Sequence, residues 1–127
     1  EVDALSVGMG TTLVIALYTS DYLLFGNIGD SSGFVLKNNH LHKITVDHSL
    51  VNLLVEAGEL TLEEAKDHPR KNVLMKALGA SLEVEADIFD CDPDVDGILL
   101  ASDGLTNMLE ISKIESIVKR LKKKLLV

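Results

Sequence analysis

The sequence predicts an α+β fold built on antiparallel β-sheet. Two β-rich hairpins come first, a stretch with helical spacing follows, and two further strands precede a last amphipathic helix. Strands joined by short turns pair antiparallel, whereas parallel strands need a long crossover between them. The expected order is therefore four strands, three helices, two strands and one helix, which is an α+β arrangement.

The first four strands are expected to form two hairpins. Residues 11–19 and 22–28 are rich in β-branched and aliphatic side chains and are separated by a Ser-Asp pair that can turn the chain. Residues 33–37 and 40–45 flank Asn38-Asn39. Asn tolerates the left-handed backbone of a two-residue hairpin turn, so this pair predicts the second hairpin.

A helical pattern replaces the strands near residue 50. Apolar residues recur there at helical spacing, with Ser49 in the N-cap position and Gly58 after the last turn. Thr61 and Glu64 have the spacing of a capping box, which predicts a second short helix. Residues 73–78 predict a third short helix, with a strand as the alternative.

The last third of the chain predicts two strands and a helix. Apolar Val84, Ala86 and Ile88 alternate with acidic residues, as in a strand with one solvated face. Residues 98–101 are an apolar run typical of a buried strand. The segment 112–115 has the pattern of a helix start, and the helix after it has an apolar face made of Ile114, Ile117, Val118, Leu121 and Leu125.

Composition narrows the class of protein. The 127 residues suit one domain or part of a larger one, and the absence of an initiator Met suggests a piece of a longer protein. A net charge of −8 disfavours a nucleic-acid partner, and the basic C-terminal end is expected to be the solvated face of a helix. No apolar stretch approaches a membrane span, and the single Cys91 indicates a reducing, cytoplasmic location.

Two aspartates stand directly after apolar strands. Asp103 follows residues 98–101 and Asp30 follows residues 23–28, each within a Gly-containing turn sequence. Carboxylates held at strand ends suit a hard divalent cation such as Mg²⁺ or Mn²⁺. An Asp-Gly turn without chemistry remains the alternative for both positions.

The histidines carry a weaker signal. His40 and His42 lie on one face of a predicted strand, but no third ligand stands at a spacing that would complete a zinc site. His48 and His68 flank the helical segment, and we expect them to be structural caps or surface residues.

Taken together, several strings resemble the bacterial metal-dependent protein phosphatases of the PPM (type 2C) family. The resemblance covers nearly the whole chain, with one departure, Ser32, where the family usually has Arg. The strings that carry it are Gly8-Met9-Gly10-Thr11-Thr12, Gly26-Asn27-Ile28-Gly29-Asp30-Ser31, Asp47-His48-Ser49, His68-Pro69-Arg70-Lys71-Asn72-Val73 and Ser102-Asp103-Gly104-Leu105-Thr106-Asn107.

The resemblance implies a fold and a metal site. Residues 1–127 would be a partial catalytic domain, part of a four-layer αββα sandwich with Mn²⁺ or Mg²⁺ in its cleft. Asp103 matches a metal ligand of the family, Asp30 matches the acid that shares a third, labile metal with it, and Asn72 stands where another ligand can occur. The segment 47–79 corresponds to the helical flap beside the active site.

The resemblance also implies a reaction, the hydrolysis of phosphoserine or phosphothreonine in proteins by a metal-activated water. The substrates would be phosphoproteins made by a serine/threonine kinase. Other family motifs that hold the two metals have no counterpart here, so we expect the isolated chain to be inactive and, with sheet faces uncovered, to self-associate. The alternatives are a noncatalytic phosphatase-like scaffold for protein binding or regulation, and an unrelated small metal-binding protein.

Overall fold

The computed structural model describes residues 8–125, which form two antiparallel sheets and four helices. One sheet has the order β1-β2-β5 and the other the order β4-β3-β6. The strands are β1 (Leu13–Tyr18), β2 (Leu23–Ile28), β3 (Ser32–Lys37), β4 (His40–Lys43), β5 (Asp87–Cys91) and β6 (Gly97–Ala101), and the helices are α1 (Leu50–Glu56), α2 (Leu62–Lys66), α3 (Asp103–Thr106) and α4 (Ile111–Leu125).

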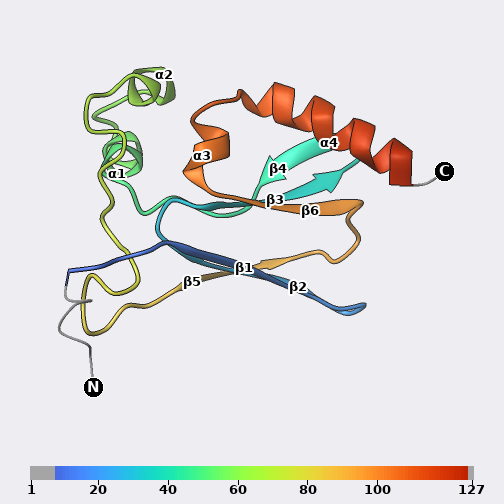
Figure 1. Cartoon of the computed structure of the whole chain (residues 1–127), viewed down its shortest axis with the longest axis horizontal. Helices are drawn as coiled ribbons and strands as arrows, with labels where there is room; N and C mark the ends of the chain where they lie inside the picture. Colours follow the sequence, from blue (N-terminus) through green and yellow to red (C-terminus); the bar gives the residue numbers. More distant parts are fainter. Residues whose placement is uncertain (1–7, 126–127) are drawn as a thin grey trace.

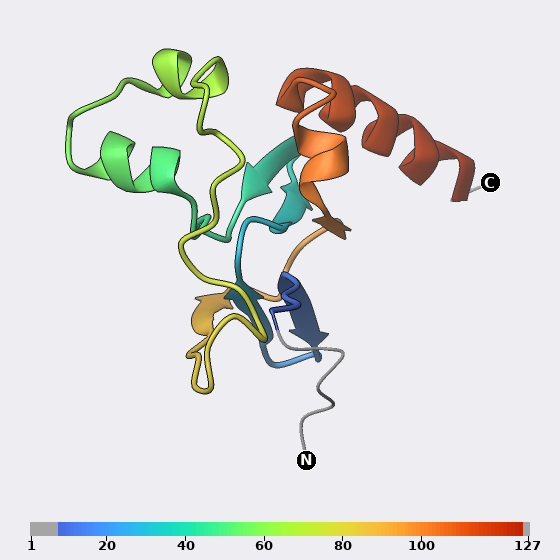
Figure 2. The ribbon, with the colours of Figure 1, turned by 60° about the vertical axis from the view of Figure 1, so that its left-hand side comes forward.

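The elements are arranged in layers. Helices α3 and α4 lie over the β4-β3-β6 sheet, and the β1-β2-β5 sheet lies beneath it (Figure 1). Helices α1 and α2 project beyond one end of the two sheets (Figure 2). The predicted α+β sandwich with antiparallel sheets is confirmed.

Two apolar clusters join these layers, and strand β3 contributes to both. Val35 packs with Leu23 and Phe25 between the two sheets, whereas Phe34 packs with Ile114 of α4 on the opposite side. Neighbouring residues of a strand point to opposite faces, so β3 is covered on both. Its position at the centre of its sheet follows from this two-sided burial.

The local predictions about turns and caps are confirmed. Asn38 and Asn39 have φ angles of 52° and 64°, as the predicted hairpin turn requires. The Ser49 side chain accepts a hydrogen bond from the Asn52 N–H at the start of α1. Thr61 forms the complete capping box that begins α2.

The predicted helix over residues 73–78 is wrong. The segment instead forms two isolated antiparallel bridges, Ser49 with Leu74 and Thr11 with Leu78. Thr11 and Leu78 exchange two backbone hydrogen bonds of 2.9 and 2.8 Å. Because these backbone groups pair with distant segments, they are not available for a helix, and the extended alternative is closer to the structure.

The predicted face of the strand near residue 88 is also wrong. Strand β5 begins at Asp87, and Ile88 points outward with 65% of its surface exposed. Phe89 points inward because it is paired in register with the buried Phe25. The packing of Phe89 on the core beside Phe25 therefore decides which face of β5 is inward, and it is not the face that the alternation of charges predicted.

Two helix starts differ from expectation as well. Helix α4 begins at Ile111, so Ser112 lies within its first turn and does not cap it. The Glu115 carboxylate, which a capping box would use locally, accepts the backbone N–H of Leu41 instead. Residues 103–106, which could have been a plain turn, form the single turn of α3.

The outer face of the β1-β2-β5 sheet is apolar, and no other described element packs against it in Figure 1. Ile15 and Ile88 are 51% and 65% exposed on this face. They lie on either side of Gly26, whose missing side chain would contact both. Within residues 8–125, no helix is both long enough and apolar enough to cross a membrane.

Candidate metal-binding site

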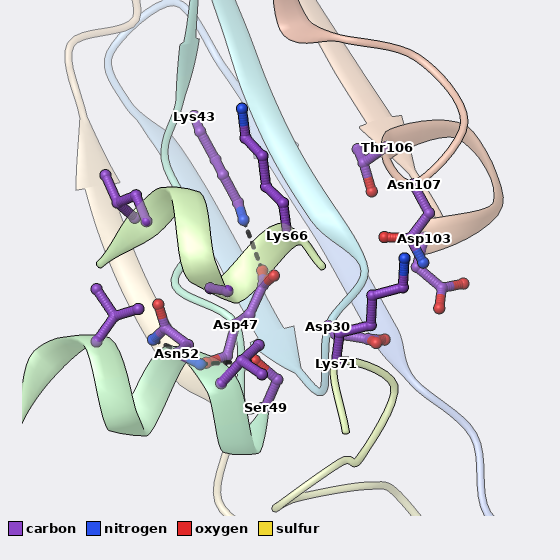
Figure 3. A pocket seen from close by; sticks show the side chains of 14 residues that line it. Asp30, Lys43, Asp47, Ser49, Asn52, Lys66, Lys71, Asp103, Thr106 and Asn107 are labelled. Carbon is purple, nitrogen blue, oxygen red and sulfur yellow. Dashed lines mark hydrogen bonds and ion pairs between the residues drawn. The ribbon is translucent and has the colours of Figure 1, made fainter. Parts of the chain in front are cut away.

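A pocket of about 240 Å³ lies where α1, α2 and α3 meet the ends of the two sheets (Figure 3). Both aspartates predicted as metal ligands line it, Asp30 from the turn after β2 and Asp103 from the start of α3. The polar residues that line it are Asp30, Lys43, Asp47, Ser49, Asn52, Lys66, Lys71, Asp103, Thr106 and Asn107.

Asp30 is placed by a turn that depends on glycine. Gly29 has a φ of +104°, and a Cβ there would lie 2.5 Å from Cγ2 of Thr12. A side chain at this position would therefore meet both backbone strain and a steric clash. Glycine lets the chain reverse within the space beside Thr12 and turn Asp30 toward the pocket.

Hydrogen bonds fix both neighbours of Asp30 in the chain. The Gly29 carbonyl accepts the backbone N–H of His48 at 2.9 Å and the Asn27 side-chain amide at 3.2 Å. On the other side, the hydroxyls of Ser31 and Thr12 lie 2.6 Å apart. Asp30 is thus held between two anchored residues, a rigid support of the kind that metal ligands need.

Asp103 is placed by strand β6 and helix α3. The strand ends at Ala101, Ser102 is the N-cap residue, and Asp103 opens the helix. The Asp103 carbonyl accepts the Asn107 N–H at 2.8 Å, which closes the turn. An acid in the first turn of a helix is stabilised by the backbone N–H groups there.

Three aspartates and three lysines line the pocket, and the aspartates lie close enough to affect one another. Burial raises the pKa of Asp30, the nearby carboxylates of Asp103 and Asp47 raise it further, and its own N–H and the Lys43 ammonium oppose the shift. Lys43 is shared with a second carboxylate of the pocket, because its Nζ pairs with Asp47 Oδ1 at 2.7 Å. Burial and the repulsion between carboxylates both disfavour the ionised form of Asp30, and a bound cation would relieve them.

The residues present fit one hard cation better than two. Among residues 8–125, the structure brings together no group of three His, Cys, Asp or Glu side chains that could hold a metal ion. Asp30 and Asp103 offer oxygen ligands of the type that Mg²⁺ and Mn²⁺ prefer, and water can fill the remaining positions. A centre with two metals needs ligands in addition to these.

Asn72, the third predicted ligand, does not line this pocket. It lies exposed in the turn after α2, and its neighbour Lys71 lines the pocket instead. Figure 3 shows Lys71 extending from its loop toward the side on which Asp103 lies. The role of Asn72 in metal binding stays a prediction.

Reasoning from the sequence missed several residues of the pocket region. Asp47 and Lys71 line the pocket and belong to motifs that carry the family resemblance. The sequence predicts no separate role for them, because neither directly follows a strand as Asp30 does. His48 was expected to be a cap or surface residue, yet its ring is only 13% exposed and bonds to Gly29 and Asp87. Only the folded arrangement brings residues 29, 48 and 87 together.

Comparison with known sequences identifies relatives over nearly the whole chain. Residues 6–125 match the family model described as Protein phosphatase 2C. The serine/threonine phosphatase Stp of Listeria welshimeri is 48% identical over 113 residues, which are 88% of this chain and 45% of the relative. The protein phosphatase PhpP of Streptococcus pneumoniae is 42% identical over 112 residues, 87% of this chain and 46% of the relative.

Solved structures give the same result. The serine/threonine phosphatase Stp1 of Staphylococcus aureus superposes with a TM-score of 0.86 at 38% identity, over 91% of this chain and 46% of that one. The catalytic domain of the phosphatase PstP in complex with two manganese ions has a TM-score of 0.74 at 33% identity, over 89% and 46% of the two chains. The chain therefore spans about half the length of the relatives it matches.

Proposed function

The chain belongs to the protein phosphatase 2C family, and from this we propose that it forms part of a metal-dependent protein serine/threonine phosphatase. The observation that carries the proposal is that Asp30 and Asp103, which come from the ends of two different sheets, line one pocket. The substrates would be phosphoserine and phosphothreonine residues of proteins, the products of a serine/threonine kinase. The single Cys91 favours a cytoplasmic location.

Asp30 and Asp103 would hold Mn²⁺ or Mg²⁺, and the burial and neighbouring carboxylates that raise the pKa of Asp30 would favour a cation beside it. Divalent cations at such a site supply an activated water as nucleophile and stabilise the charge of the phosphoryl group. Lys66 and Lys71 add positive charge to the same pocket. Their ammonium groups would attract a phosphorylated segment toward the aspartates.

The segment 47–79 would act as the flap that helps to select the substrate. It carries α1 and α2, and α2 faces the turn before α4 across a second cavity of about 440 Å³. Lys66 of α2 lies 3.7 Å from Glu110 across this cavity. A peptide running from the pocket would pass between these two elements only after this ion pair opened.

The isolated chain would be inactive, because two carboxylates do not complete a centre with two metals. The experiment is to assay hydrolysis of a phosphothreonine peptide with Mn²⁺, using the isolated chain and the intact protein that contains it. We expect turnover only from the intact protein. Turnover by the 127-residue chain at the rate of the intact protein would contradict the account of incomplete ligands.

A matched pair of variants in the intact protein tests the site. Asp103→Asn is expected to lower kcat by at least about 100-fold, because it removes a metal-ligating charge. Asp90→Asn makes the same substitution at an exposed position on β5 and should leave kcat unchanged. Equal activity of the Asp103→Asn and Asp90→Asn variants would contradict the proposed role of Asp103.

The rival reading is a noncatalytic scaffold that keeps the phosphatase fold for protein binding. The intact protein separates the two readings before any assay. An Arg, an acidic ligand and an Asp-Gly-Met-Gly-Gly-His stretch upstream of this chain would favour the enzyme. Their absence would favour the scaffold.

A further inference from the structure

His48 touches the turn before Asp30 at two points. Its ring Nδ1 accepts the backbone N–H of Gly29 at 2.9 Å, and its own backbone N–H donates to the Gly29 carbonyl at 2.9 Å. Both peptide groups that flank the α-carbon of Gly29 are therefore bonded to one residue. Because the Gly29 backbone is fixed on both sides, the direction in which the chain enters Asp30 is fixed as well.

The far side of the His48 ring is held by a carboxylate. Nε2 lies 2.7 Å from Oδ2 of Asp87, the first residue of strand β5. Since the Gly29 N–H can only donate, Nδ1 must be the accepting nitrogen, and the hydrogen of a neutral ring is on Nε2. Asp87 thus selects the tautomer and the ring orientation in which Nδ1 can accept from Gly29.

The arrangement is a relay of contacts from a sheet to the pocket. It runs from Asp87 through the ring of His48 to Gly29, and Asp30 follows in the chain. The ring is mostly buried, whereas Asp87 is 47% exposed, so the carboxylate can adjust while the ring cannot. Neither His48 nor Asp87 lines the pocket with Asp30 and Asp103.

We propose that His48, oriented by Asp87, is a positioning residue that holds Asp30 in the place where it can share a divalent cation with Asp103. The inference rests on the proposed function in one respect, that the Asp30 and Asp103 pocket binds Mn²⁺ or Mg²⁺. It assigns no chemical step to the imidazole. His48 acts through the backbone of Gly29, and Asp87 acts through His48.

Three variants of the 127-residue chain test the relay, with Mn²⁺ affinity as the measurement. His48→Ala removes both ring contacts and should weaken Mn²⁺ binding about tenfold, as losses of supporting residues around metal ligands commonly do. His48→Asn keeps an acceptor near the position of Nδ1 and should restore most of the affinity. Asp87→Asn weakens the bond to Nε2. Its Mn²⁺ affinity should lie between those of His48→Ala and His48→Asn.

A double substitution decides whether Asp87 works through His48. In the His48→Ala background, Asp87→Asn should have no further effect on Mn²⁺ affinity, because the contact it weakens no longer exists. Additive losses would overturn the relay. The ¹⁵N signals of the His48 ring give an independent check, with a bare Nδ1 and a protonated Nε2 expected in the unsubstituted chain.

A control separates positioning from a general loss of stability. Val118→Ala removes part of a side chain that packs against the core on α4, on the other side of the β4-β3-β6 sheet from β5. It should lower the thermal midpoint without changing Mn²⁺ affinity. If Val118→Ala and His48→Ala weaken Mn²⁺ binding equally, the positioning role is wrong.

Failure of the proposed function has a different signature. If the unsubstituted chain binds no Mn²⁺, the proposed metal site is wrong. Amide hydrogen exchange at Gly29 and Asp30 then tests whether His48 holds the turn before Asp30. Faster exchange at these two amides in His48→Ala, restored by His48→Asn, would support it. Unchanged exchange in His48→Ala, or a ring with its hydrogen on Nδ1, would overturn it.

Discussion

Glu115 of helix α4 accepts the backbone N–H of Leu41 in strand β4 through Oε2 at 2.8 Å. The strand lies at the edge of its sheet, where backbone groups are otherwise open to other chains. The carboxylate closes part of this edge and joins the helix layer to the sheet. The hydrogen bond from Leu41 lowers the pKa of Glu115, and Lys119 and His40 lower it further.

This contact predicts a pH dependence of stability. A carboxyl whose pKa is lowered by folding stabilises the folded state above its unfolded pKa, and the contribution disappears as the pH falls through the folded value. Glu115→Gln, which can still accept the Leu41 N–H but cannot ionise, should lose less stability than the parent chain between neutral pH and about pH 3. Urea denaturation at both pH values measures this difference, and equal losses would contradict it.

Asp30→Asn should stabilise the chain in the absence of metal. Burial and the charges of Asp103 and Asp47 raise the pKa of Asp30, so its ionised form opposes folding at neutral pH. Removing the charge should raise the free energy of unfolding by up to about 1 kcal/mol, because the group is partly screened by solvent. The gain should vanish below the pKa of Asp30, where the parent chain is also neutral, and saturating Mn²⁺ should stabilise only the parent.

Gly29→Ala should destabilise the turn by about 2–4 kcal/mol, since it combines a positive φ with an overlap against Thr12. Adding Thr12→Ser removes the methyl group that lies 2.5 Å from the new Cβ and keeps the hydroxyl that contacts Ser31. The double variant should recover part of the loss, with the strain of the backbone remaining. Denaturation of the four chains of this cycle measures the recovered part, and additive effects would show that Thr12 is not the obstacle.

The outer face of the β1-β2-β5 sheet predicts self-association of the isolated chain. Ile88 is 65% exposed there beside other apolar side chains, and exposed apolar patches on sheets drive association. Ile88→Thr, which keeps a β-branched residue, should shift the equilibrium toward monomer in sedimentation velocity. Met108→Thr removes a side chain that is 78% exposed outside this face and serves as the control. A compact monomer at high concentration of the parent chain would contradict the prediction.

The sequence predicts well what depends on neighbouring residues. The Asn38-Asn39 turn and the capping box of Thr61 are local arrangements, and the structure has both. Asp30 and Asp103 each follow a strand and line one pocket, as expected of strand ends at one side of a sandwich, while their role as metal ligands stays a prediction. The family resemblance, carried by motifs across the chain, supplied the sandwich architecture.

What failed depends on contacts between distant residues. The predicted orientation of Ile88 is wrong because Phe89 pairs with Phe25, which lies more than sixty positions earlier in the sequence. The segment before Gly79 is not helical because Leu78 pairs with Thr11. His48 is expected from the sequence to be a structural cap or a surface residue, because nothing near it in the sequence reveals its contacts with Gly29 and Asp87. These pairings emerge only when the whole chain is folded.

Strand β3 alternates its side chains between the two cores, so it has no free face. Under selection for stability alone, polar substitutions on this strand would be tolerated only at its ends, because every position between them is buried. Strand β5, with one side open, can vary there at little cost in this chain. Sequences of such proteins should therefore diverge at different rates in different strands. In β3, substitutions should be slow and limited to small and apolar residues. At the outer positions of β5, they should depend on the surface that packs against that face.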